Sequence, residues 1–155
     1  MSEPNLVIGI AMPFQTALRK AFNANHIPSF YHLSSNYDDI MDHIRHVGTM
    51  TGHDREAAAL VQKYNDILTE IIQRHKDESA PRVLIVFGTP TSYQLASSKT
   101  YVGDIFQRLG AKNVADVYLP QDVSENALDG YIPLNLETMA VLDCDKVCLL
   151  YTSPS

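Results

Sequence analysis

The sequence predicts an α/β protein in which two incomplete Rossmann-like lobes with parallel sheets are joined by one long helix. Short apolar runs rich in β-branched residues alternate with segments of helical periodicity, a pattern typical of parallel sheets covered by helices. Residues 54–75 contain no Gly or Pro and carry an apolar repeat of helical period. On either side of this segment the expected strands are too few to complete a doubly wound sheet.

Residues 1–52 are expected to be the end of an N-terminal lobe with the order strand, helix, strand, helix. The first apolar run, LVIGI, is short and β-branched, as in strands that are buried on both faces. Pro suits the first turn of a helix, and Asn is common where a helix ends or where the next helix is capped. The expected elements are a strand at 6–10, a helix from Pro13 to Asn25, a strand at 29–33, and a helix that is capped by Asn36 and ends at Gly48 or Gly52.

Residues 53–77 are predicted to form the interlobe helix. A helix over 54–75 would be roughly 33 Å long, about the diameter of a small domain. The alanines at 57–59 favour helix and allow close packing, and Glu70 with Arg74 adds a favourable i,i+4 pair. The apolar stripe that is expected to pack consists of Leu60, Tyr64, Ile67, Leu68, Ile71 and Ile72.

Residues 78–155 are expected to be the start of a C-terminal lobe. Its clearest strand is RVLIVF at 82–87, after which Gly88 begins a long polar loop. The remaining expected elements are a helix capped by Thr100 and stopped by Gly110, a short apolar piece at 114–115, irregular chain over 116–134, a helix capped by Asn135, and a strand at 146–150. The unfinished sheets predict that the chain is a piece of a longer protein. The ending CLLYTSPS looks like translated sequencing adapter, so the residues after about 148 are expected to be artefactual.

The composition limits the classes of partner. The 155 residues carry a formal net charge of −6, and an acidic surface repels phosphate backbones, so no nucleic-acid partner is expected. No apolar stretch reaches the roughly 20 residues that span a bilayer, and the N-terminus MSEPNLVIGI lacks the features of a signal peptide. Cys144 and Cys148 are four apart, and we expect two reduced, buried thiols on the same side of a strand.

The sequence offers no recognisable catalytic motif, since GxGxxG, GxxxxGK[ST], GxSxG and HExxH are all missing. We therefore predict no catalytic residue, no intrinsic cofactor and no metal site. His43 and His46 have a spacing that could hold a metal, but no third ligand is identifiable, and we interpret them as part of a solvated helix face. The alternatives are a small α/β enzyme using Asp104, His32 or Tyr93, which lacks a recognisable nucleophile–base pair, and a cytosolic interaction domain.

Candidate ligand-binding residues follow the predicted strands. In parallel α/β sheets, ligands bind beyond the carboxyl ends of the strands. The loop after the strand at 82–87 is long, polar and aromatic, and tyrosines suit a large ligand that is held by stacking and a few hydrogen bonds. The predicted ligand-binding residues are Met12, Phe14, Thr91, Ser92, Tyr93 and Tyr101.

Several motifs resemble, in order and spacing, those of one protein family. PNLVIGI at 4–10 is similar to the family's "PDLVIG" strand, and TGHDREAAALVQKYNDIL at 51–68 to the entry of its interlobe helix. LGAKNV at 109–114 is similar to an "LGG-x-N" element, PLNLE at 133–137 to a "P-hydroxyl-x-E" segment, and LDCDKV at 142–147 to an "LDPD-V" strand. The chain thus resembles the substrate-binding proteins of ABC importers for iron-siderophores, haem and cobalamin, which are class III periplasmic-binding-protein-like. The resemblance covers nearly the whole chain, although it departs at Ala111, where glycine is more common, and at Cys144, where proline is usual.

The resemblance implies two lobes bridged by one helix, a ligand held in the cleft between them, and no enzymatic activity. It also implies an extracytoplasmic location, in the periplasm or lipid-anchored at the cell surface. The metal chelate would be delivered to an ABC transporter permease, with membrane contact only through a lipid anchor or the permease. Glu137 matches a glutamate that meets arginines of the permease, although an acid in a first helical turn also stabilises the helix dipole. Axial haem ligands are not identifiable, so the resemblance does not favour haem over siderophore or cobalamin.

Overall fold

A computed structural model describes residues 4–11, 16–88, 92–118 and 130–151 of the chain. The chain divides into two compact units, residues 1–34 and 35–155, so the helix that follows Ser34 groups with the second unit. The division into lobes at 1–52, 53–77 and 78–155 remains a prediction. Among the described residues, none of the helices combines the length and apolar character needed to cross a membrane.

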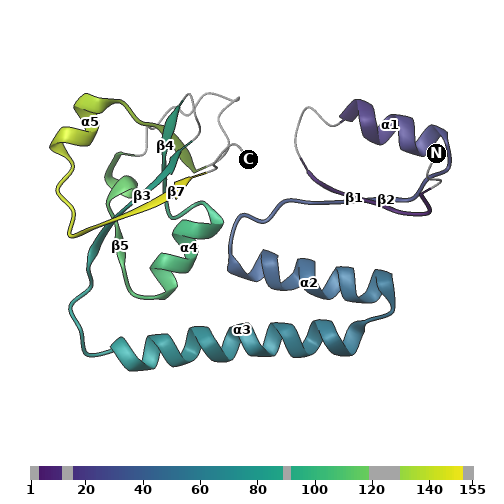
Figure 1. The fold of residues 1–155 in the computed structure, drawn as a ribbon, viewed down its shortest axis with the longest axis horizontal. Coiled ribbons are helices and arrows are strands. Elements are labelled where there is room, and N and C mark those ends of the chain that lie inside the picture. The colour runs from purple at the N-terminus through teal and green to yellow at the C-terminus, as the bar shows by residue number, and fades with distance from the viewer. Residues whose placement is uncertain (1–3, 12–15, 89–91, 119–129, 152–155) are drawn as a thin grey trace. The chain divides into compact units, whose positions relative to one another are not determined.

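The first unit is a strand–helix–strand element (Figure 1). Strand β1 (Val7–Ile10) pairs in parallel with β2 (Ser29–His32), and α1 (Thr16–Ala24) connects them. These elements confirm the predicted order, and Asn25 ends the helix as expected because its side-chain amide donates to the Ala21 carbonyl over 2.8 Å. The predicted start of the helix at Pro13 lies outside the described residues.

Two long helices open the second unit and lie side by side, as Figure 1 shows. Helix α2 (Tyr37–Thr51) is capped by Asn36, whose side-chain oxygen accepts from the Asp39 amide, and it ends at Gly52, which adopts a left-handed φ of 73°. Helix α3 (Asp54–His75) is the predicted long helix. The two helices approach so closely that a Cβ at Gly48 would lie 2.4 Å from the Ala57 Cβ, so this crossing depends on small side chains.

The apolar stripe predicted for α3 is partly wrong. Val61 is buried, with Leu68 packed beside it, in a cluster with Tyr37 and Met41 of α2. By contrast, three residues of the predicted stripe are 39–42% exposed: Leu60, Tyr64 and Ile67. The face of α3 that packs on α2 is therefore not the predicted stripe of large apolar residues. It includes the small Ala57 and the polar Asn65, which an apolar pattern does not mark.

The sheet of the second unit is mixed rather than parallel, which corrects the prediction. Its central strand β3 (Arg82–Gly88) pairs in parallel with β5 (Lys112–Asn113) and β7 (Lys146–Tyr151). The expected polar loop instead contains strand β4 (Tyr93–Ala96), antiparallel to β3, and the expected irregular region contains β6 (Tyr131–Pro133), antiparallel to β4. Both strands are too short to give a readable alternation, yet Leu95 and Ala96 are fully buried by the sheet.

Each face of this sheet has its own apolar core. Helix α4 (Tyr101–Arg108) covers the face with Val83 and Ile85, and Cys148 packs there. The other face packs around Leu84 and Val86, with Cys144 against it. On that side lie the 3₁₀ helix η2 (Val114–Tyr118) and residues flanking α5 (Leu136–Val141). Both thiols are free and half-buried. They do not share a side as expected, because Cys144 precedes β7 rather than belonging to it.

An ion-pair cluster fixes the starts of the two long parallel strands. The Arg82 guanidinium bonds Asp143, at 3.2 Å for one of its two contacts, and Asp145, at 3.1 Å. The Asp145 carboxylate also accepts from the Arg82 backbone amide over 2.7 Å. The hydrogen bond from the Arg82 side chain lowers the pKa of Asp145, and its backbone hydrogen bond adds to this effect. The second Asp of the LDCDKV segment therefore links β7 to β3.

Candidate functional site

Two exposed tyrosines lie on one face of the sheet where β3 and β7 end. Tyr93 opens the antiparallel β4, and Tyr151 belongs to the residues after about 148 that are expected to be artefactual. Gly88 ends β3 and lies between Tyr93 of β4 and Tyr151 of β7 in the strand register. The tyrosines are 51% and 56% exposed. A Cβ at Gly88 would lie 3.2 Å from the Tyr93 ring and 3.5 Å from the Tyr151 ring. Glycine here allows both rings to lie close over the central strand.

A second aromatic pair lies on the face covered by α4. Phe87 packs edge-on against Tyr131, with ring centroids 5.9 Å apart, and Tyr131 packs on the core of that face. Burial raises the pKa of the Tyr131 phenol, and the neighbouring Tyr101 adds to the increase. Tyr101 is 42% exposed. Tyr93 lies on the Gly88 face of the sheet, whereas Tyr101 begins α4, the helix that covers the other face.

A tight turn holds Tyr101 at the start of α4. The Thr100 hydroxyl donates to the Ser97 carbonyl over 2.8 Å and accepts from the Gly103 amide over 3.1 Å. Both hydroxyl-bearing residues are buried. A Cβ at Gly103 would lie 2.0 Å from the Ser97 carbonyl oxygen. The predicted cap by Thr100 is confirmed, whereas the need for glycine three residues later is visible only in the folded turn.

The structure describes only some of the remaining predicted site residues. Met12, Phe14 and Thr91 lie outside the described residues. Ser92 is exposed immediately before β4, and Glu137 is exposed in the first turn of α5. The structure therefore brings Ser92 and Tyr93 together at the expected sheet edge, and the ligand and permease roles remain predictions.

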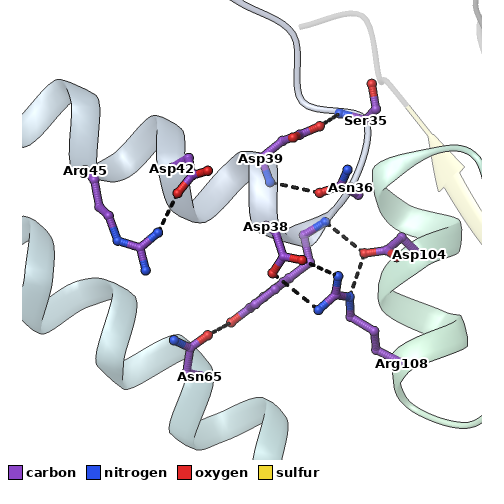
Figure 2. Close-up of polar contacts among 10 residues, drawn as sticks. Ser35, Asn36, Asp38, Asp39, Asp42, Arg45, Asn65, Asp104 and Arg108 are labelled. Atoms are coloured by element: carbon purple, nitrogen blue, oxygen red, sulfur yellow. Dashed lines mark hydrogen bonds and ion pairs between the residues drawn. The ribbon is translucent and has the colours of Figure 1, made fainter.

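A polar network joins α4 to α2 beside this sheet (Figure 2). The Arg108 guanidinium donates from Nε to Asp104 of its own helix over 2.8 Å and from Nη2 to Asp38 of α2 over 2.7 Å. The Asp104 carboxylate also accepts from the Tyr37 backbone amide over 2.8 Å. Asp104 is thus occupied by two donors, which gives the residue a structural role in place of the enzymatic one considered above.

The network continues through Tyr37 to α3. The Tyr37 hydroxyl donates to Asn65 over 3.0 Å, and the Arg108 guanidinium lies 5.4 Å from the centroid of the Tyr37 ring. Burial raises the pKa of Tyr37 against the opposing effect of the Arg108 cation. The hydrogen bond to Asp38 raises the pKa of Arg108, with a further contribution from Asp104. Only the i,i+4 spacing of Asp104 and Arg108 was visible in the sequence as a signal.

A groove of about 690 Å³ lies at the opposite end of the parallel strands, where β3 and β7 begin. Its apolar lining comes from the last turns of α3, from α4 and from β7, and includes Ile71, Ile72, Phe106, Leu109 and Val147. Its charged or basic lining residues are His75, Lys76, Glu78, Arg108 and Lys146. Of the predicted ligand-binding residues that the structure describes, Ser92, Tyr93 and Tyr101, none lines this groove.

The histidines of α2 follow the expected surface pattern only in part. His46 is exposed, but His43 is half-buried, so the interpretation of both as a solvated face is wrong for His43. Across the described parts of the chain, His, Cys, Asp and Glu side chains do not gather in groups of three or more that could hold a metal ion.

The sequence and fold match one family of proteins. The family model described as periplasmic binding protein matches residues 2–152. The High-affinity heme uptake system protein IsdE of Staphylococcus aureus is 34% identical in an alignment of 83 residues that covers 50% of this chain and 28% of IsdE.

Solved structures share the fold at low sequence identity. Staphylococcus aureus IsdE complexed with heme gives a TM-score of 0.71 at 20% identity, over 97% of this chain and 55% of that one. A periplasmic heme-binding protein from Pseudomonas aeruginosa gives a TM-score of 0.72 at 22% identity, over 98% of this chain and 53% of that one. The siderophore-binding protein BauB, bound to acinetobactin and ferric iron, gives a TM-score of 0.63 at 14% identity, over 96% of this chain and 49% of that one. The chain spans about half the length of these proteins, and the likeness confirms the predicted α/β class with partial lobes.

Proposed function

The chain belongs to the periplasmic binding protein family, and from this premise we propose that it captures a solute outside the cytoplasm for an ABC importer. The observation that carries the proposal is the family match over residues 2–152. The sequence and structural relatives are named as heme-uptake, heme-binding and siderophore-binding proteins, which supports an iron chelate as the cargo. Their names give no support to the alternative of an enzyme.

Exposed tyrosines on β4 and α4 supply a physical basis for holding such a cargo. Tyr93 and Tyr101 combine an apolar ring face with a hydroxyl donor, and each is about half exposed. A large, flat or partly apolar chelate gains free energy from burial against such rings and orientation from a few hydrogen bonds. The capture needs no covalent step and no intrinsic cofactor, because the metal arrives inside the ligand.

Binding of three chelate classes to the protein expressed from its complete reading frame tests this proposal. Haemin, a ferric siderophore and cyanocobalamin would be titrated separately while tyrosine fluorescence and visible absorption are followed. We expect saturable binding of haemin or of the ferric siderophore, since these match the relatives' named ligands. If none of the three changes either signal, the chelate proposal is wrong.

Glu137 is the residue through which we propose docking to the permease. It is exposed, and complementary charge across an interface mainly sets the rate and specificity of association. Glu137→Gln should weaken docking to the cognate permease about tenfold, equivalent to about 1.4 kcal/mol, with ligand affinity unchanged. Glu56→Gln, at an exposed position on α3, is the matched control in a binding assay with the purified permease. Equal docking by both variants would remove Glu137 from the interface.

A further inference from the structure

Arg108 connects three helices of the second unit through short contacts. Its Nε bonds Asp104 of α4, its Nη2 bonds Asp38 of α2, and its guanidinium faces the Tyr37 ring. Tyr37 then reaches Asn65 of α3 through its hydroxyl. The described contacts thus run without a break from α4 through α2 to α3 (Figure 2).

Burial makes the ion pair of Arg108 with Asp104 stronger than its ion pair with Asp38. The Asp104 side chain is 18% exposed and that of Arg108 is 33% exposed, whereas Asp38 is 70% exposed. Charge-assisted hydrogen bonds are stronger than neutral ones, and solvent screens the pair with Asp38 more than the pair with Asp104. An apolar contact supports the same junction, because Ile105 of α4 packs on the cluster formed by Tyr37 and Val61.

The geometry requires arginine rather than a positive charge alone. Separate nitrogens of one planar group serve acids on two different helices while its face lies over an aromatic ring. A lysine ammonium is a compact point charge that cannot reproduce this fork or this stacking. Arg45 provides the contrast, because its ion pair is with Asp42 on its own helix, and both side chains are more than half exposed.

We propose that Arg108 is a positioning residue that sets the orientation of the tyrosine-bearing sheet relative to the helix pair α2–α3. Helix α4 is tied to the sheet at its first turn, where Thr100 bonds Ser97 and Gly103. At its last turn Arg108 ties it to α2. The orientation claim stands without the proposed function, whereas its consequence for ligand affinity rests on that function.

Two variants of Arg108 and one matched control test the proposal. Arg108→Lys keeps the charge and Arg108→Gln removes it, and Arg45→Lys makes the conservative change on an ion pair confined to α2. Hydrogen exchange measured by mass spectrometry would report the last turn of α4 and the first turn of α2. Haemin and a ferric siderophore would be the binding probes, at a temperature at which all variants are folded. Asp38→Asn, which changes an exposed partner, extends the test should either Arg108 variant fail to fold.

We expect Arg108→Lys to raise exchange at both turns and to weaken probe binding, each by about tenfold, the scale of one lost hydrogen bond to a charged group. Arg45→Lys should change neither. Unchanged exchange at both turns in the Arg108 variants would overturn the proposal. Faster exchange with unchanged probe affinity would reduce Arg108 to a structural tie and also overturn its positioning role. If the unsubstituted protein binds neither probe, the iron-chelate function fails and the exchange comparison alone decides the orientation claim.

Discussion

At the scale of single residues, several side chains have roles that their sequence context did not indicate. Asp145 belongs to a recognisable motif, but its contact with Arg82, 63 positions earlier, exists only in the folded chain. Gly88 marks the end of a strand in the sequence, and the structure adds that two tyrosine rings lie over it. Such roles depend on register between distant strands, which no local pattern specifies.

Asp145 makes the strand junction sensitive to acid. Arg82 lowers the pKa of Asp145 below its ordinary value, so its ionised form stabilises the folded chain above the unfolded pKa of about 3.9. This contribution is lost as the pH falls through the lower, folded-state pKa. Asp145→Asn should therefore lower stability at neutral pH and flatten the fall of stability with acid, measured by urea unfolding between pH 7 and pH 3. Identical pH profiles for the two proteins would rule out this role.

At the scale of elements, local signals predicted helices better than strands. Asn36 and Thr100 cap helices as expected, because capping depends on residues within one turn. The sequence did not predict the short strands β4 and β6, since three or four residues carry little periodicity. Both strands also pair antiparallel to their neighbours, whereas a parallel sheet was expected. The packed face of α3 was misplaced for a related reason. The predicted stripe consisted of large apolar side chains, whereas the close contact with α2 is made by the small Ala57.

The crossing of α2 and α3 gives a direct test of that packing. Gly48→Ala would place a methyl group 2.4 Å from the Ala57 Cβ, and overpacking of this kind costs about 1 to 3 kcal/mol. The gain in helix propensity, about 1 kcal/mol, opposes this cost. We expect a net loss of thermal stability, recovered in part by the double variant Gly48→Ala, Ala57→Gly. A stabilised single variant would show that the helices can separate at no cost.

At the scale of the whole molecule, the sequence predicted the class of fold and the candidate edge, but not the arrangement of that edge. Tyr93 and Tyr101 were predicted as neighbours along one loop, but Tyr93 opens strand β4 and Tyr101 begins helix α4. The groove lined by Ile72 and Phe106 was not predicted at all, because its walls come from segments far apart in the sequence. This groove and the exposed Tyr93 lie at opposite ends of the parallel strands of the second unit.

The location of bound chelate tests the central claim most directly. Hydrogen exchange would be measured by mass spectrometry with and without a saturating amount of the chelate that binds in the titration. We expect protection over residues 92–101, which run from the start of β4, with Tyr93, to the start of α4, with Tyr101. Protection confined to residues 71–83 and 106–111, which line the groove at the other end, would contradict this claim.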